Sequence, residues 1–397
     1  MKNNPAMPTE RILMIAYTNY RSDPRVIRAA EAAAGAGLEV DFVTLRYDGD
    51  PKVEVVNGVR VIHLDQGRYR GGGLLAYTLS YLQFFVRCLC KVTFQLSARR
   101  YRVVHVNNMP DFFVFCALLP RLMGAKVLLD IHDPMPDTFA AKFKNGSDSL
   151  AFKLLLWQEL LSARFANRVL TVSEPLKRHV LMGHGMADEA IEVIANFPDD
   201  QLFPVRRNYT LNGKLRLAFH GTMLERYGLG PLLTALSKVK HRDKLAVRFI
   251  GDGDYAPQMR AMITALGIGD FVEFDNRIYP LREMPRRLAD CDLGLVPLAT
   301  SSVINYALPL KLLEYVSMGL PVVTVRNAAV AHYFREDECL FYAPGDAESL
   351  PRLLDGLAEN PARVMECRQK VLAVREKFLW SNEKRKYVAL LRELAGN

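Results

Sequence analysis

The chain has 397 residues, half of them hydrophobic and about a quarter charged, which is enough for two buried cores and excludes long disordered stretches. Its formal net charge of +9 fits a soluble basic enzyme, and it also fits a protein with a nucleic acid, phosphorylated or membrane partner. The six cysteines form no CxxC pair, so a zinc or disulfide framework is excluded and buried, reduced thiols are expected.

We expect no targeting signal in the N-terminal stretch. It is polar up to Glu10, and the apolar run that follows Arg11 is too short for the hydrophobic core of a signal peptide. No segment approaches the roughly 20 uninterrupted apolar residues of a membrane-spanning helix. We therefore expect a cytoplasmic protein.

Short apolar runs alternate with longer helical patterns in the first half of the chain. Strands are predicted at 12–16, 40–45, 59–64, 103–106, 127–131 and 169–172, and helices at, for example, 23–36 and 111–123. Alternation of this kind predicts βαβ units around a parallel sheet. We expect residues 1–200 to form one Rossmann-like domain.

The stretch between Asp65 and Asp111 contains no acidic residue. Its basic residues, which alternate with tyrosines and phenylalanines, are Arg68, Arg70, Arg87, Lys91, Arg99, Arg100 and Arg102. A basic, aromatic-rich helix is typical of a contact with a membrane surface or an anionic lipid head group. The alternative is a core helix whose basic residues line its solvent face. For the membrane interpretation we select Arg87, Lys91, Arg99 and Arg100.

Polar residues cluster directly after the predicted strand 127–131. Asp130, His132 and Asp133 lie where an α/β sheet places its ligands, and two prolines force a non-helical loop there. His132 is a candidate base or a candidate ligand for a substrate hydroxyl. The alternative is that His132 only forms hydrogen bonds within its own loop.

The pattern pauses between residues 196 and 213, which are polar and turn-rich and form the expected linker. Beyond it, strands are predicted at 215–219, 246–250, 272–274, 293–297 and 322–325, whereas 348–394 has helical patterns only. We expect a second Rossmann-like domain over 201–380. A C-terminal helix over 381–397 is expected to pack back on the first domain.

Two strand-to-helix turns in the second half contain glycines. Gly221 would let the backbone approach a ligand, and Arg226 would offer a forked set of donors to a diphosphate. The alternative is an ordinary turn with a solvated arginine. The second turn, beginning at Gly251, is half of a glycine-rich fingerprint and by itself is weak evidence for a dinucleotide. Asp254 is an alternative cap of the following helix.

The stretch 308–323 predicts an anion site at a helix start. Pro309 suits the first turn of a helix, whose free amides, together with Lys311, would bind an anion such as a diphosphate. Glu314, one turn on, would accept hydrogen bonds from both hydroxyls of a ribose. The alternative is that Glu314 is only an ion-pair partner for Lys311.

These motifs together resemble glycosyltransferase family 4, retaining enzymes of the GT-B fold. The resemblance covers nearly the whole chain. It rests on SDPRV (22–26), VHVNNMPD (104–111), DIHDPMPD (130–137), TVSE (171–174), NFP (196–198), HGT (220–222), GDG (251–253), LPLKLLEY (308–315) and MGLPVV (318–323), in the expected order. It implies two Rossmann-like domains facing a cleft, followed by C-terminal helices, with the donor bound mainly by the second domain and the acceptor by the first.

The resemblance also assigns roles to single residues. Glu314 matches the glutamate that holds the ribose, the segment 309–311 matches the loop that cradles the diphosphate, and His132 matches a histidine near the reacting sugar. Arg226 lies beside the phosphate-binding lysine position, which is Tyr227 here. The complete donor set is Gly221, Thr222, Arg226, Gly251, Asn276, Arg277, Ile278, Pro309, Leu310, Lys311 and Glu314. The catalytic set is His132, Asp133 and Arg226.

The chain departs from the family pattern in two places. The family often has a glutamate eight positions before Glu314, and here that position is Tyr306, which leaves the donor sugar undefined. The N-terminal glycine pair of the family is replaced by the segment 19–24. In this region Arg21, Asp23 and Arg25 are expected to contact the acceptor or the donor phosphate.

From these motifs we expect a hexosyltransferase that uses a UDP- or GDP-linked sugar and a lipid-linked or polysaccharide acceptor of the cell envelope. The sequence contains no HxxxH pair with a nearby acid and no GxxxxGK[ST] motif, so no metal and no other cofactor are expected. Nucleic-acid binding is not expected either, since the basic residues follow one helix near a ligand cleft. The expected location is the inner face of the cytoplasmic membrane. Two rivals are a catalytically silent GT-B scaffold or activator of a membrane synthase, and a sugar-nucleotide epimerase of similar fold.

Overall fold

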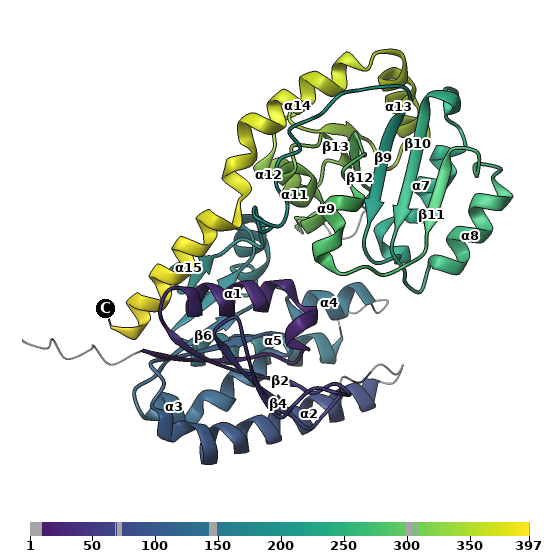
Figure 1. The fold of residues 1–397 in the computed structure, drawn as a ribbon. Coiled ribbons are helices and arrows are strands. Elements are labelled where there is room, and N and C mark those ends of the chain that lie inside the picture. The colour runs from purple at the N-terminus through teal and green to yellow at the C-terminus, as the bar shows by residue number, and fades with distance from the viewer. Residues whose placement is uncertain are drawn as a thin grey trace, which may run out of the picture. The chain divides into compact units, whose positions relative to one another are not determined.

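The computed structural model describes residues 10–67, 69, 74–142, 149–298, 305–306 and 308–396. Arg68 and Arg70 of the basic stretch lie outside this set. The chain divides into two compact units, which we call unit 1 (Met1–Asn196 with Glu383–Asn397) and unit 2 (Phe197–Asn382). In Figure 1, unit 1 takes the purple and blue part of the chain and the yellow C-terminal end. Each unit is an α/β domain around a mainly parallel sheet, which confirms the predicted fold class.

The sheet of unit 1 has the strand order β3-β4-β2-β1-β5-β6-β7-β8. The pair β3–β4 is antiparallel, and the other neighbours are parallel, with Ile12 opposite both Val40 and Val103. The central strands are buried and read as continuous apolar runs. The strands are β1 (Arg11–Ile15), β2 (Glu39–Leu45), β3 (Val53–Val56), β4 (Val59–Leu64), β5 (Val103–Asn107), β6 (Lys126–Asp130), β7 (Arg168–Thr171) and β8 (Ile191–Val193).

The main helices of unit 1 are α1 (Pro24–Gly35), α2 (Leu74–Lys91) with η2 (Val92–Leu96) and η3 (Ser97–Arg99), η4 (Asp111–Ala117), α3 (Leu118–Leu122), α4 (Met135–Lys142), α5 (Leu150–Phe165), α6 (Glu174–Leu176), η6 (Lys177–Leu181) and α15 (Trp380–Ala395), which begins in unit 2. The predicted helix 111–123 is divided into a 3-10 segment and a short α-helix. Pro120 lies in the first turn of that α-helix, where its missing N–H group is not needed.

Unit 2 contains a six-stranded sheet with the order β11-β10-β9-β12-β13-β14, and all its pairs are parallel. The carboxyl ends of its strands therefore lie along one edge of the sheet. The strands are β9 (Leu215–His220), β10 (Leu245–Ile250), β11 (Val272–Asp275), β12 (Leu293–Val296), β13 (Val322–Val325) and β14 (Leu340–Tyr342). The main helices are η8 (Glu225–Tyr227), α7 (Leu229–Leu236), α8 (Ala256–Ala265), α9 (Met284–Arg287), α11 (Leu310–Ser317), α12 (Ala328–Tyr333), α13 (Ser349–Glu359), α14 (Ala362–Val374) and η11 (Arg375–Phe378).

The segment after Asn196, expected to be a linker, has neither helix nor strand until β9 begins. It nevertheless packs into unit 2. Phe203 and Tyr209 are buried, the Tyr209 hydroxyl donates to the Asp292 carbonyl at 2.8 Å, and the Arg368 guanidinium lies 4.1 Å from the centre of the Tyr209 ring. This segment is therefore a structural part of unit 2.

Two further findings concern the whole of the described chain. All six cysteines are free, and Cys90 is exposed whereas the other five are buried, so the expectation of buried thiols fails at that position. Cys90 lies near the end of α2. No helix within residues 10–396, as far as they are described, is long and apolar enough to cross a membrane.

Candidate functional site

Two glycine turns follow neighbouring strands of unit 2 and pack backbone against backbone. Gly221 has φ = 117° and Gly251 has φ = 142°, values that favour glycine. A Cβ atom at Gly251 would lie 1.9 Å from the Gly221 carbonyl oxygen. The amide of Gly221 donates to the Ile250 carbonyl and the amide of Gly251 donates to the Asp275 carbonyl. Both glycines are thus required for the close approach of these turns at the strand ends.

Lys311, in the first turn of α11, extends to the Gly221 turn. Its Nζ atom lies 3.9 Å from the centre of the Phe219 ring and 4.7 Å from the centre of the Tyr227 ring. It would also lie 3.5 Å from a Cβ atom at Gly221. Burial lowers the pKa of Lys311 to about 8, against the opposing influence of Glu314. The structure therefore places a partly desolvated ammonium group beside Gly221, which has no side chain.

Glu314 is buried and forms its close contact with His220, not with Lys311. One Glu314 carboxylate oxygen lies 3.1 Å from His220 Nε2. Next to it, the Tyr315 hydroxyl donates to the Ala218 carbonyl at 2.6 Å and the Tyr315 ring lies over the space that a side chain at position 294 would occupy. The ion pair between Lys311 and Glu314, which the sequence left open, is not formed. His220, at the end of β9, belongs to the site although sequence reasoning gave it no role.

Arg226 and Lys311 both contact the same aromatic side chain. Arg226 is exposed and its guanidinium lies 5.5 Å from the centre of the Tyr227 ring, while Lys311 approaches that ring as described above. Thr222 is exposed next to Gly221. Two cations from η8 and α11 therefore gather around Tyr227, the position at which the family resemblance implies a lysine.

Asn276, Arg277 and Ile278 follow β11, at the edge of the same sheet. Asn276 donates to the Asp252 carboxylate at 2.7 Å, Arg277 donates to the Asp275 carboxylate at 2.8 Å, and Ile278 is 80% exposed. Burial opposes ionisation of Asp275, but hydrogen bonds from Arg277 and Tyr279 and nearby arginine charges bring its pKa below the usual value. The amide of Gly251 connects this edge to the two glycine turns. The predicted donor residues thus lie along the strand ends of unit 2, with the segment 276–278 at the periphery.

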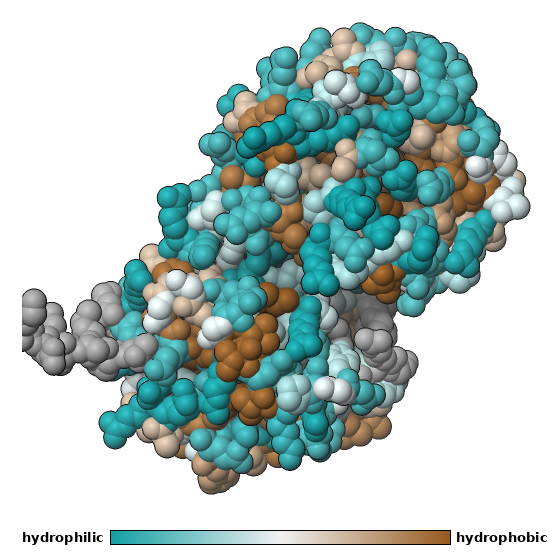
Figure 2. All heavy atoms as spheres, viewed as in Figure 1, coloured by the Kyte–Doolittle hydropathy of each residue, from teal (hydrophilic) through white to brown (hydrophobic). Residues whose placement is uncertain are grey.

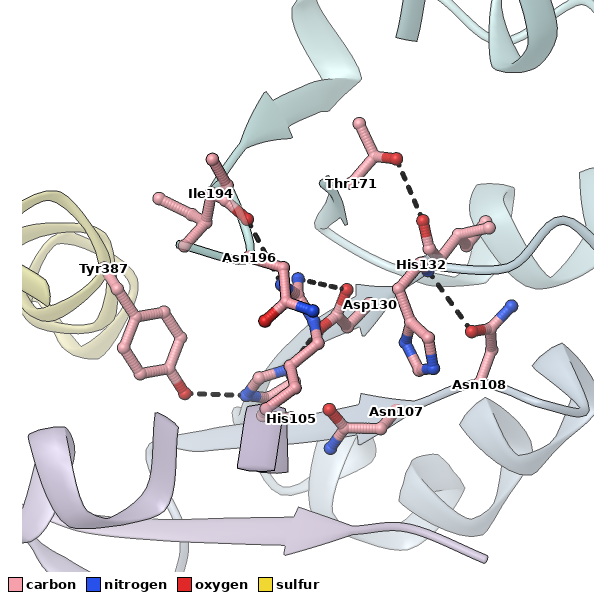
Figure 3. A network of polar contacts seen from close by, with 12 residues as sticks. His105, Asn107, Asn108, Asp130, His132, Thr171, Ile194, Asn196 and Tyr387 are labelled. Carbon is pink, nitrogen blue, oxygen red and sulfur yellow. Dashed lines mark hydrogen bonds and ion pairs between the residues drawn. The ribbon is translucent and has the colours of Figure 1, made fainter. Parts of the chain in front are cut away.

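The strand ends of unit 1 contain a buried polar network (Figure 3). Arg25 of α1 donates two hydrogen bonds of 2.8 Å to the Asp130 carboxylate and another to the Ile194 carbonyl. His105 lies between this carboxylate, at 3.8 Å, and the hydroxyl of Tyr387 in α15, at 2.7 Å. Burial opposes ionisation of Asp130, but the charge and hydrogen bonds of Arg25 and the nearby His105 hold its pKa well below the usual value.

His132 and Asp133 follow β6 in a loop that Asn108 holds in place. Asn108 accepts a hydrogen bond from the His132 amide at 3.2 Å and donates to the Asp133 carbonyl at 2.7 Å and the Asp111 carboxylate at 3.0 Å. Burial, together with the charge of Glu159, raises the pKa of Asp111 to about 7. The Nδ1 atom of His132 is buried without a hydrogen-bond partner among the described residues, and Asp133 is exposed. The alternative was that the His132 ring only forms hydrogen bonds within its own loop. The described residues of that loop supply no such partner for Nδ1.

The expected acceptor residues of the first loop have structural partners. Asp23 caps the amino end of α1 by accepting from the Arg25 amide, and Arg21 pairs with Glu54. Arg25 is buried and its guanidinium is occupied by Asp130. The ligand role expected for Arg25 stays a prediction, and its guanidinium donors are engaged within unit 1.

The four basic residues selected for a membrane contact divide into two groups. Arg99 forms ion pairs with Asp41 at 2.8 Å and with Glu39 at 3.4 Å, so its charge is neutralised within unit 1, and its membrane role stays a prediction. Arg87 and Arg100 are exposed, and Lys91 donates to Gln95 on its own helix. These three remain available at the surface.

Comparison with known families gives one match in each unit. The description "Glycosyl transferase 4-like domain" matches residues 23–196. The description "Glycosyl transferases group 1" matches residues 214–360. The two matches together include most of the chain and follow the division into units.

The chain is similar to several characterised or named glycosyltransferases. It is 27% identical over 214 residues to the amylovoran biosynthesis glycosyltransferase AmsK of Erwinia amylovora, an alignment that includes 53% of this chain and 52% of AmsK. It therefore spans about half the length of that relative. It is 26% identical to the probable glycosyltransferase WbjE of Pseudomonas aeruginosa (70% of this chain, 71% of WbjE). It is 24% identical to the chitobiosyldiphosphodolichol beta-mannosyltransferase of Kluyveromyces lactis (79% of this chain, 74% of the relative).

Solved structures share the fold over nearly the whole chain. Sucrose-phosphate synthase from Thermosynechococcus elongatus superposes with a TM-score of 0.77 at 17% identity, over 97% of this chain and 99% of that one. Anabaena HepE in complex with UDP and glucose gives a TM-score of 0.71 at 15% identity, over 97% and 100% of the two chains. With the two family matches, these findings show that the chain belongs to the glycosyltransferases of the GT-B fold.

Proposed function

We propose that this GT-B glycosyltransferase moves a hexose from a UDP- or GDP-linked sugar to a lipid-linked or polysaccharide acceptor of the cell envelope, with retention of configuration. The observation that carries the proposal is the position of the Lys311 ammonium group beside the Gly221 turn. The names of the relatives support the acceptor class, since they include amylovoran biosynthesis and a diphosphodolichol substrate. HepE, solved with UDP, supports a uridine nucleotide.

The chemistry at the Gly221 turn suits a diphosphate leaving group. When the bond between the sugar and the diphosphate breaks, negative charge develops on the diphosphate oxygens. A partly desolvated cation stabilises such charge more strongly than a hydrated one. Lys311 is such a cation, the amides at the start of α11 add positive potential, and Arg226 supplies a second charge at the surface. The proposal therefore requires no metal ion.

Glu314 is proposed to bind the ribose. Its carboxylate is buried at the strand ends and is held next to His220. A buried carboxylate accepts hydrogen bonds from two adjacent hydroxyls with little loss of side-chain entropy, because its orientation is already fixed. The remaining donor contacts are assigned to the turns at Gly221 and Gly251 and, at the periphery, to Asn276.

In unit 1, His132 and Asp133 are proposed as catalytic groups. The Nδ1 atom of His132 has no partner among the described residues, so it is free to accept a hydrogen bond from a substrate hydroxyl. The Asn108 side chain holds the loop through hydrogen bonds with the backbone of His132 and Asp133. These bonds do not involve the imidazole ring.

A thermal-shift panel of UDP-, GDP-, ADP- and TDP-sugars tests the donor. A cognate donor at a hundredfold excess over its Kd stabilises the folded protein by about 2.7 kcal/mol. The increase in Tm should be lost in Lys311→Met and kept in Lys370→Met, which changes an exposed lysine of unit 2 that pairs with Asp337. If no nucleotide sugar shifts the Tm of the wild-type protein, the donor site is wrong. Donor binding without hydrolysis or transfer would favour the silent scaffold suggested by Tyr306.

A further inference from the structure

The exposed apolar side chains of this protein are concentrated on one layer of unit 1. Twelve of the 18 large hydrophobic side chains that are exposed in the described chain belong to the α2–η2, α3 and α5 helices. They are Leu75, Leu79, Leu82, Val86, Phe94, Leu118, Leu122, Met123 (directly after α3), Leu150, Leu154, Trp157 and Leu161. Monomeric soluble proteins rarely expose contiguous apolar patches larger than a few hundred Å². We call this set the α2–α3–α5 face.

Two helices of this face expose stripes with the same spacing. Along α2 the exposed residues are Leu75, Leu79, Leu82 and Val86, and along α5 they are Leu150, Leu154, Trp157 and Leu161. Both sets follow the positions i, i+4, i+7 and i+11, which form one side of an α-helix. The opposite side of each helix is buried, as Phe84 and Cys88 of α2 and Glu159 and Ser162 of α5 show. Each helix therefore has one buried side and an apolar side that is exposed.

The helices belong to one layer because η4 packs between them. The Phe85 ring of α2 lies 5.5 Å from the Phe112 ring of η4, and the Phe115 ring of η4 lies 5.1 Å from the Phe165 ring of α5. All four side chains pack against the same core cluster. In Figure 2, tan and brown spheres appear along the lower edge of unit 1, where Figure 1 draws α2 and α3.

The exposed charges on this layer have a single sign. The charged residues of α2, η2, η3, α3 and α5 are Arg87, Lys91, Arg99, Arg121, Lys153, Arg164 and Glu159. Glu159 is fully buried and pairs with His184 at 2.7 Å. Arg99 is neutralised by Asp41 and Glu39. Every other charge on these helices is a lysine or an arginine at or near the surface.

We infer that the α2–α3–α5 face binds unit 1 to the surface of an anionic lipid bilayer. Apolar side chains would enter the boundary between head groups and acyl chains, and the surrounding lysines and arginines would contact anionic head groups. A second copy of the chain is a poorer occupant, because it would bring two faces of the same positive sign together. This inference identifies α5 as a lipid contact, in addition to the basic stretch seen in the sequence. It concerns unit 1 alone and does not depend on the proposed donor site.

Vesicle flotation of the full chain tests this inference. We expect co-flotation with vesicles of phosphatidylglycerol and phosphatidylcholine and none with phosphatidylcholine alone. The triple variant Arg87→Gln/Lys153→Gln/Arg164→Gln should bind about a hundredfold more weakly, at roughly fivefold per charge. Its control, Lys52→Gln/Arg178→Gln/Lys384→Gln, removes three charges elsewhere on unit 1 and should bind like the wild type.

The apolar contribution is tested with a matched pair of variants. Leu79→Ser/Trp157→Ser should bind at least about tenfold more weakly, whereas Val53→Ser/Val55→Ser, which changes exposed residues of β3, should not. Tryptophan emission gives a second readout on the wild type, since Trp157 is 63% exposed and Trp380 only 9%. The emission of Trp157 should shift to the blue when anionic vesicles are added, and Trp157→Phe should abolish the shift.

Three results would overturn the inference. The first is wild-type protein that remains with the unfloated fraction in the presence of anionic vesicles. The second is an equal loss of binding in the face variants and in their controls. The third is concentration-dependent dimerisation that Leu79→Ser/Trp157→Ser abolishes while flotation is unchanged, since the face would then be an interface between two copies. Donor binding in the thermal-shift panel is independent of each of these results.

Discussion

Unit 1 and unit 2 share a parallel sheet with helices, but they differ in what lies at the ends of their strands. In unit 1 the buried charge of Arg25 is paired with Asp130. In unit 2 the Lys311 ammonium group lies over two aromatic rings, beside Gly221, which has no side chain. A paired buried charge holds a structure together, whereas an unneutralised one beside an open turn is suited to an anionic ligand.

The two units also differ in how many large hydrophobic side chains they expose. Among the described residues, 15 of the 18 exposed large hydrophobic side chains belong to unit 1, and only Ile278, Met365 and Leu372 belong to unit 2. The same architecture thus has an apolar, basic surface in unit 1 and a polar surface in unit 2. The comparison teaches that the shared fold does not determine the ligand of either unit. The ligand depends on the loops and on the outer sides of the helices.

The largest effect is expected from breaking the buried pair of unit 1. Asp130→Asn leaves Arg25 without its carboxylate and should lower the free energy of unfolding of unit 1 by about 3 to 5 kcal/mol. Urea denaturation followed by circular dichroism measures this change. The control Asp65→Asn removes an exposed partner of Arg46 and should cost less than about 1 kcal/mol. Equal effects of the two changes would show that the buried network does not stabilise unit 1.

The next effect tests the unneutralised charge of unit 2. Lys311→Met should lower the turnover of donor about a hundredfold, because it removes a desolvated cation from the proposed diphosphate site. The free energy of unfolding should not fall, since a partly desolvated charge is replaced by an apolar side chain of similar length. Turnover is measured as nucleotide diphosphate released, with Lys370→Met as the control. Wild-type turnover in Lys311→Met would remove the basis for distinguishing the two units.

A smaller effect is expected at Glu314. Glu314→Gln keeps the volume of the side chain but removes the charged acceptor, and should weaken donor binding about tenfold. Isothermal titration with the donor identified in the panel measures this loss. His220→Gln, which removes the neighbour and keeps the carboxylate, should weaken binding less. The ribose assignment fails if Glu314→Gln binds the donor like the wild type.

The smallest effects concern pH, and the two units should respond in opposite directions above pH 7. Burial opposes the charge of His184, but hydrogen bonds to Asp137 and Glu159 raise its pKa to about 9. A raised pKa means that the stability from charged His184 is present below its unfolded value of about 6.5 and is lost as pH rises through 9. Lys311 has its pKa lowered to about 8, so its cost to folding is present below pH 8 and is relieved towards pH 10.5.

Thermal denaturation at several pH values between 7 and 10 measures both trends. His184→Gln should flatten the pH dependence of unit 1, and Lys311→Met should flatten that of unit 2. The donor affinity of the wild type should also fall above pH 8 as Lys311 loses its proton. A single variant that flattens both profiles would show that the two units do not unfold independently, and the comparison by unit would then not hold.

Most of the fold follows from local patterns in the sequence. The buried strands are continuous apolar runs, so 12–16 was predicted where β1 spans Arg11–Ile15. Short edge strands such as β3 (Val53–Val56) and β14 (Leu340–Tyr342) were missed, because they are formed by pairing with a neighbour. The turns at Gly221 and Gly251 lie at one edge of the unit 2 sheet, because parallel strands bring their carboxyl ends together.

The pairing of polar side chains did not follow from the sequence. Arg25 and Asp130 are 105 positions apart, and Lys311 reaches Tyr227 across a similar separation. No local pattern specifies which of several charged residues meet when strands and helices assemble. This is why Arg25 was expected at a ligand and Glu314 was considered as a partner of Lys311. His220 could have been found, since it is the last residue of β9 and adjoins Gly221.

Unit 1 contains residues from both ends of the chain, and this has a consequence for how the protein is made. Tyr387, whose hydroxyl forms a hydrogen bond with His105 in the unit 1 sheet, follows the whole of unit 2 in the chain. All of unit 2 is synthesised before it, which at about 5–20 residues per second takes roughly 10 to 40 s. During that time the nascent unit 1 has a buried histidine without its partner and lacks one of its covering helices. Expression of residues 1–196 alone would make this intermediate permanent, so an isolated unit 1 should be produced with residues 383–397 attached.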